Sequence, residues 1–212
     1  MPESPTRRAG LARLGVSAAA VGWGGLTGLG ALMAPAHAQV ASGPDATIES
    51  LLRTGGVVIA FRHALAPGTF DPPEFRLGDC STQRNLSDDG RAQARRIGQW
   101  FSQRGLKPLR VRSSPWCRCM DTASLAFGAG PAAAWPALGS PRGASETTNA
   151  ESLRELRSTL QQAGARPGFE VWVTHMFVLS DLTGQGSQSG EGLVLKAQRG
   201  GRIEVLARLL VA

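Results

Sequence analysis

Short apolar runs alternate with longer amphipathic segments along most of this chain. Runs of strand length predict β-strands at 57–62, 109–112, 169–174, 192–197 and 203–209. Amphipathic segments predict helices at 46–53, 87–104, 114–127, 149–162 and 177–182. An Ala-, Pro- and Gly-rich stretch between them predicts one more short strand near 135–138. This alternation indicates an α/β fold, a three-layer sandwich whose mostly parallel central sheet is flanked by helices.

Two of the predicted helices begin with capping signals. Ser87 precedes two acidic residues, and Ser114 precedes Pro115, which suits the first helical position. The loop 65–86, before the first of them, is too long for a plain connection, and such loops tend to be functional.

The first 38 residues have the pattern of a secretory signal peptide. Arg7 and Arg8 precede a weakly apolar stretch, 11–33, which ends in Ala36-His37-Ala38. We expect cleavage after Ala38, export to the periplasm, and one domain at 39–212. The arginine pair is a loose match to a twin-arginine signal. A transmembrane anchor is the alternative, but glycines interrupt the stretch and a cleavage signal ends it.

The charge and composition of the chain indicate which kinds of molecule it binds. Removal of residues 1–38 takes three arginines and one glutamate from a formal net charge of +7 and leaves +5. The remaining basic residues are dispersed and nearly all arginine, which argues against nucleic-acid binding. Arginine favours bidentate recognition of phosphate or carboxylate. We expect no stable membrane insertion after cleavage, and the sequence does not determine the oligomeric state.

The three cysteines, Cys80, Cys117 and Cys119, predict one disulfide and one free thiol in an exported protein. Residues two apart on a helix point away from each other, so Cys80 should pair with Cys117 or Cys119. A zinc site is a weak alternative, because no histidine lies near the C-x-C pair.

Two predicted strands end in histidine, V-V-I-A-F-R-H and V-W-V-T-H. Carboxyl ends of parallel strands share one sheet edge, so His63 and His175 should be neighbours, although a single histidine is usually an ordinary packed side chain. Arg62, and Arg118 near a helix N-terminus, add positive charge. Together these groups suit a tetrahedral dianion, whose phosphorus a histidine would attack without a metal.

Four motifs resemble the histidine phosphatase superfamily, of the phosphoglycerate mutase-like type: Arg62-His63-Ala64, the helix start 85–94, Ser113-Ser114-Pro115 through Arg118 to Ala123, and Val173-Thr174-His175. The resemblance, to a small exported bacterial member, implies that His63 is the phosphorylated nucleophile. Arg62, Arg118 and His175 would hold the phosphoryl group, and no cofactor or metal is implied. A disulfide from Cys80 would tie the 65–86 loop to the helix that presents Arg118.

The proton donor departs from the family pattern. The family often has a glutamate after the second arginine, but here the region is irregular. The candidates are Glu146, Glu151 and Asp71, with Glu155 as a further one. The residues after the second histidine, Met176-Phe177-Val178, are apolar and predict a hydrophobic pocket rim.

The sequence therefore predicts an exported phosphatase that hydrolyses phosphomonoesters through a phosphohistidine. A small phosphorylated substrate is expected, and a cell-envelope sugar phosphate is one candidate by analogy. The alternatives are a phosphohistidine-protein phosphatase and a catalytically weak pseudoenzyme that keeps the phosphate pocket.

Overall fold

The computed structural model describes residues 43–128, 130, 132–139 and 146–211, and for 146–149 it describes the backbone only. The predicted signal peptide lies outside these residues. No helix among the described residues is both long enough and apolar enough to cross a membrane.

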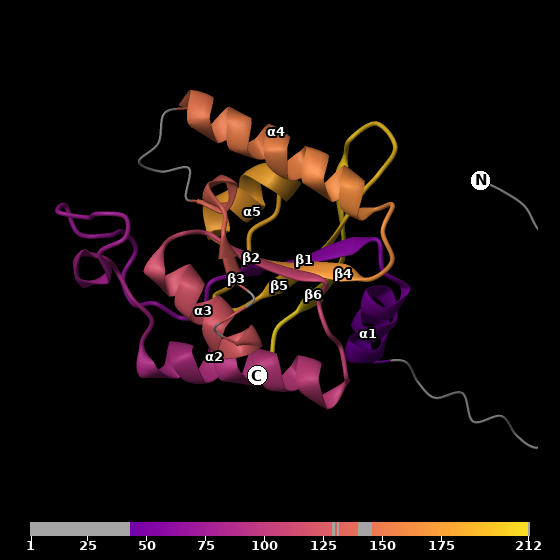
Figure 1. Cartoon of the computed structure of the whole chain (residues 1–212), viewed down its shortest axis with the longest axis horizontal. Helices are drawn as coiled ribbons and strands as arrows, with labels where there is room; N and C mark the ends of the chain where they lie inside the picture. Colours follow the sequence, from indigo (N-terminus) through magenta and orange to yellow (C-terminus); the bar gives the residue numbers. More distant parts are fainter. Residues whose placement is uncertain (1–42, 129, 131, 140–145, 212) are drawn as a thin grey trace, which may run out of the picture. The chain divides into compact units, whose positions relative to one another are not determined.

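Within the described residues, six strands form one sheet in the order β3-β2-β4-β1-β5-β6 (Figure 1). The neighbours from β3 to β1 pair in parallel, whereas β5 pairs antiparallel with both β1 and β6. The strands are β1 (Val57–Arg62), β2 (Arg110–Ser113), β3 (Ala132–Ala134), β4 (Phe169–Thr174), β5 (Gly192–Ala197) and β6 (Ile203–Leu209). The predicted α/β class is confirmed.

Helices cover both faces of this sheet, as Figure 1 shows. One face packs against α4 (Glu146–Ala163) and α5 (Met176–Thr183). The other packs against α1 (Pro44–Thr54), α2 (Asp88–Gln103) and α3 (Cys117–Phe127). The central strand β1 serves both layers because successive side chains alternate across a strand. Val57, Ile59 and Phe61 belong to the second layer, and Val58 and Ala60 to the first.

The prediction that Ser114 caps a helix at Pro115 is wrong. The backbone N–H of Ser114 still donates to the carbonyl of Val173 in β4 at 2.8 Å, so the chain stays extended past β2. Helix α3 begins only at Cys117, after Trp116. The Ser114 side chain is thereby left to make a different contact, described below.

The strand predicted near 135–138 is also displaced. Strand β3 ends at Ala134, and Pro136–Leu138 form a short 3-10 helix, η2. A proline ring holds φ near its helical value and removes a backbone donor, so Pro136 favours this turn over a strand.

The loop between β1 and α2 projects beyond the sheet (Figure 1) and contains a second 3-10 helix, η1 (Cys80–Thr82). Asp79 caps it by accepting from the backbone N–H of Ser81 at 3.1 Å. The loop ends at Ser87, whose hydroxyl accepts from the backbone N–H of Gly90 at 3.1 Å, as the predicted cap requires.

Candidate active site

The register of two parallel strands brings the two histidines together. Arg62 of β1 lies opposite Thr174 of β4, and each strand is followed by a histidine. The backbone N–H of His63 donates to the Thr174 carbonyl at 2.9 Å. The rings of His63 and His175 meet edge to face with centroids 5.6 Å apart, and the residues are only 2% and 3% exposed. The predicted neighbourhood of the two histidines is therefore present.

The Nδ1 atom of His63 lies 2.7 Å from the carbonyl oxygen of Ala64. A carbonyl only accepts, so Nδ1 carries the proton and Nε2 keeps its lone pair. Burial lowers the pKa of His63 to about 3; the Ala64 hydrogen bond opposes this shift, and Arg118, Arg84 and Arg62 reinforce it. The ring is therefore neutral at physiological pH, with a nucleophilic nitrogen available.

His175 lies between Ser114 and Arg118. Its Nδ1 is 3.3 Å from an Arg118 nitrogen, and its Nε2 is 2.8 Å from the Ser114 hydroxyl. A guanidinium only donates, so Nδ1 accepts and Nε2–H donates to Ser114. Burial lowers the pKa of His175 well below its ordinary value, and nearby Arg118 and His63 lower it further. The pairing of Ser114 with His175 was not predicted from the sequence.

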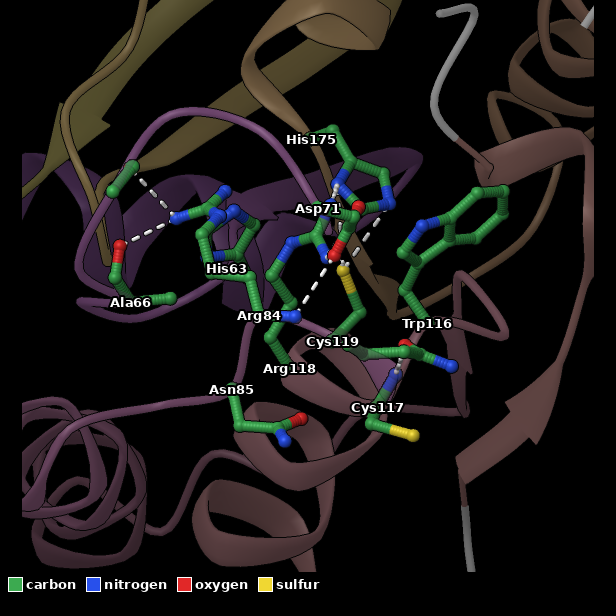
Figure 2. Close-up of polar contacts among 12 residues, drawn as sticks. His63, Ala66, Asp71, Arg84, Asn85, Trp116, Cys117, Arg118, Cys119 and His175 are labelled. Carbon is green, nitrogen blue, oxygen red and sulfur yellow. Dashed lines mark hydrogen bonds and ion pairs between the residues drawn. The ribbon is translucent and has the colours of Figure 1, made fainter. Parts of the chain in front are cut away.

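Arg118 lies in the first turn of α3 and is 4% exposed. Its Nη1 pairs with the carboxylate of Asp71 at 2.8 and 3.2 Å, the contact at the centre of Figure 2. Its Nε is buried and has no hydrogen-bond partner among the described residues. The Arg118 side chain also lines the pocket that holds both histidines, so its positive charge suits an anionic group bound there.

Two further arginines reach the same cavity. Arg62 donates from Nη1 to the Ser187 carbonyl at 3.0 Å, and its Nε is also buried without a described partner. Arg84, in the loop, donates to the carbonyl of Ala66 (Figure 2) and also to that of Gly68. Burial lowers the pKa of both guanidinium groups, and the charge of Arg118 lowers it further. Sequence reasoning missed Arg84, whose only signal is its place in the long loop just before the 85–94 motif.

The structure pairs Cys80 with Cys117 and leaves Cys119 free and buried. The bond joins the loop to the first residue of α3, and Gln83 adds a contact by accepting from the backbone N–H of Cys117 at 3.0 Å. Two bonded sulfurs cannot serve as thiolate ligands, which removes the zinc alternative. The Cys119 sulfur lies 3.5 Å from His175 Nε2. Burial raises the pKa of the Cys119 thiol to about 12, so the thiol stays protonated.

The structure describes the side chains of three proton-donor candidates, Asp71, Glu151 and Glu155. Of these, only Asp71 lines the cavity. Glu151 is exposed and lies 3.9 Å from Arg154. Glu155 accepts from Trp135 Nε1 at 2.6 Å, away from the histidines. The side chain of Glu146 lies outside the described residues. Asp71 also accepts from the backbone N–H of Arg84 at 3.0 Å, which holds its carboxylate beside Arg118.

These groups line a pocket of about 520 Å³, within the usual size of small-molecule sites. A second pocket, of about 810 Å³, lies between α2 and β2. Its lining contains no histidine or carboxylate, so of these two pockets only the smaller one holds histidines and a carboxylate.

A model of the histidine phosphatase superfamily, branch 1, matches residues 75–167. That stretch contains Arg118, and the two histidines lie on either side of it. No curated protein matches the chain by sequence.

Solved structures share the fold. The protein histidine phosphatase SixA complexed with tungstate is 16% identical, with a TM-score of 0.53 over 73% of this chain and 96% of that one. A phosphoserine phosphatase mutant from Entamoeba histolytica in complex with phosphoserine is 12% identical, at 0.53 over 72% and 95%. A mycobacterial glucosyl-3-phosphoglycerate phosphatase bound to VO3 is 16% identical, at 0.52 over 71% and 97%.

Proposed function

We propose that the chain is a member of the histidine phosphatase superfamily, whose model matches residues 75–167, and that it hydrolyses phosphate monoesters through a phosphohistidine at His63. The observation that carries the proposal is a neutral, buried histidine with a free Nε2 lone pair in a pocket that three arginines also line. A nucleophile and preorganised positive charge are what phosphoryl transfer requires.

In the first step, Nε2 of His63 forms a bond to phosphorus while the ester P–O bond breaks. Arg62, Arg118 and His175 stabilise the charge on the phosphoryl oxygens. In the second step, water attacks the phosphohistidine, the N–P bond breaks, and inorganic phosphate leaves. The Nδ1–H bond to the Ala64 carbonyl holds the ring in the reactive tautomer throughout.

Asp71 is our candidate for the acid that protonates the leaving oxygen. Its carboxyl group pairs with Arg118 and lines the pocket that holds both histidines. Asp71 then gives its proton to the departing alkoxide and takes one from the attacking water.

The role of Asp71 predicts a dependence on the leaving group. In Asp71→Asn, kcat for an alkyl phosphate should fall by about 10²-fold or more, whereas kcat for p-nitrophenyl phosphate, whose leaving group needs no proton, should fall far less. Steady-state kinetics on both substrates measure this difference. Equal losses would indicate that Asp71 only positions Arg118.

We also propose a cell-envelope location, after export by the predicted signal peptide. The Cys80–Cys117 disulfide supports it, because disulfides persist in oxidising compartments. Fractionation of cells that express the full chain, with N-terminal sequencing of the product, tests both export and cleavage after Ala38. Retention of residues 1–38 in the cytoplasmic fraction would contradict this proposal.

Catalysis itself is tested with p-nitrophenyl phosphate at several pH values. His63→Ala should abolish turnover, and quenching in alkaline detergent, in which the N–P bond is stable, should trap labelled phosphate on the wild-type protein only. Arg95→Ala, an exposed arginine of α2, is the control that should keep wild-type rates. Equal rates for wild type and His63→Ala would overturn the proposal, and phosphate binding without turnover would identify a pseudoenzyme. Hydrolysis of phosphohistidine peptides alone would identify a protein phosphatase.

A further inference from the structure

The pocket divides into a charged base and an apolar mouth. The base holds the two histidines, the arginines and Asp71. The mouth is lined by six large apolar side chains, which we call the apolar rim: Phe70, Phe75, Leu77, Trp116, Met176 and Phe177. Phe70 and Leu77 are 63% and 53% exposed. Exposed large apolar side chains grouped at the mouth of a polar site mark a binding surface for apolar groups.

Part of the apolar rim is connected to the base through ring contacts. The ring of Trp116 meets His175 edge to face at 5.3 Å, and Phe75 stacks on Trp116 at 5.5 Å. When a phosphate ester is bound with its phosphate at the base, its alcohol group would therefore lie along the rings of Trp116 and Phe75. The pocket volume of about 520 Å³ leaves space for such a group beyond the phosphate.

The rim offers little to a polyhydroxylated or charged leaving group. Among the described residues that line the pocket, Thr69 is the only uncharged one whose side chain carries a hydroxyl or amide. The rim has no charged side chain, and the guanidinium groups of Arg62 and Arg84 are held by backbone carbonyls near the base. Apart from the indole N–H of Trp116, the rim has no side chain that donates a conventional hydrogen bond, so hydroxyl or carboxylate groups buried here would lose water and gain few partners.

We propose that this site takes phosphate monoesters of apolar, uncharged alcohols, whose alkyl or aryl group lies against the apolar rim. This inference rests on the proposed phosphatase function. It disfavours a sugar phosphate, because a sugar needs several hydrogen-bonding side chains.

A series of primary alkyl phosphates tests the proposal, because all its members leave as similar alcohols. With the full protein, kcat/KM for butyl, hexyl and octyl phosphate should rise by up to about fourfold per added methylene until the pocket is filled. Hexyl phosphate should exceed glycerol 1-phosphate and glucose 6-phosphate by about tenfold or more. Equal values, or a preference for the glycerol or glucose ester, would overturn the substrate class.

The rim is tested with a matched pair of leucine variants. Leu77→Ser should lower the ratio of kcat/KM for hexyl phosphate over glycerol 1-phosphate by about threefold or more. Leu210→Ser replaces another exposed leucine, one outside the pocket, and should leave the ratio unchanged. A ratio insensitive to Leu77→Ser would contradict a role for this side chain in binding the leaving group and would overturn the rim assignment.

Failure of catalysis can be separated from failure of this inference. If no ester is hydrolysed, the proposed function fails, and calorimetric titration with hexyl phosphate and glycerol 1-phosphate still decides the substrate class. Tighter binding of the hexyl ester would support the class, and equal affinities would overturn it.

Discussion

At the scale of single residues, the protonation of the two histidines follows from partners that can only donate or only accept a hydrogen bond. The Ala64 carbonyl can only accept, and the Arg118 guanidinium can only donate. These partners leave His63 with its Nε2 lone pair and direct the Nε2–H of His175 to Ser114. The Nε2 of His63 is thus free to act as the nucleophile that we propose.

Arg118 gives a prediction at this scale. In Arg118→Lys, a single ammonium replaces the planar group that contacts Asp71, His175 and, as we propose, the phosphoryl oxygens. We expect kcat/KM for p-nitrophenyl phosphate to fall by about 10²-fold. Arg95→Lys on the exposed face of α2 is the control. Near-wild-type activity of Arg118→Lys would show that the planar guanidinium group of Arg118 is not needed for catalysis.

At the scale of elements, the start of α2 packs directly behind the loop that follows His63. A Cβ on Gly90 would lie 2.0 Å from the carbonyl oxygen of Leu65. Gly90→Ala should therefore displace this loop, lower the free energy of unfolding by about 1–3 kcal/mol, and reduce kcat. Gly186→Ala, where a Cβ would meet nothing within 4 Å, is the matched control. Urea unfolding and kinetics of both variants provide the comparison.

The disulfide is the second prediction at this scale. Cys80 and Cys117 are 37 residues apart, and loss of their bond should lower the free energy of unfolding by about 2–4 kcal/mol. The double variant Cys80→Ser/Cys117→Ser should also lose activity, because the loop that carries Asp71 and Arg84 is no longer joined to α3. Dithiothreitol should reproduce the effect in the wild type. Full activity of the reduced protein would show that other contacts hold the loop.

At the scale of the whole molecule, two buried neutral histidines link stability to pH. The folded pKa of His63 is about 3, below its ordinary 6.5, and that of His175 is also lowered. At pH values between the folded pKa and the ordinary pKa of the unfolded chain, the unfolded chain binds more protons than the folded one. The free energy of unfolding therefore falls as the pH falls.

We expect each histidine to contribute up to about 1.4 kcal/mol per pH unit to this slope below pH 6.5. Urea unfolding between pH 4.5 and 7.5 measures it. His63→Gln should reduce the slope, and saturating phosphate should reduce it too, because a bound dianion raises the pKa of both rings. A slope unchanged in His63→Gln would contradict the buried neutral state of this residue.

The sequence by itself determined the central strands and the histidine pair. The runs 57–62, 169–174, 192–197 and 203–209 form strands at their predicted bounds. In the central strands, 57–62 and 169–174, the apolar run is buried on both faces of the sheet. The parallel pairing of β1 with β4 then requires His63 and His175 to meet.

Only the tertiary structure decided how Asp71, Arg84 and Ser114 join the site. Asp71 and Arg84 lie in a loop without hydrophobic periodicity, and their positions depend on Arg118 and on a disulfide that closes over 37 residues. Ser114 contacts His175 because its backbone stays paired with β4 and does not enter a helix. Contacts between segments far apart in the sequence determine these positions, and the local structural propensity of the residues does not predict such contacts.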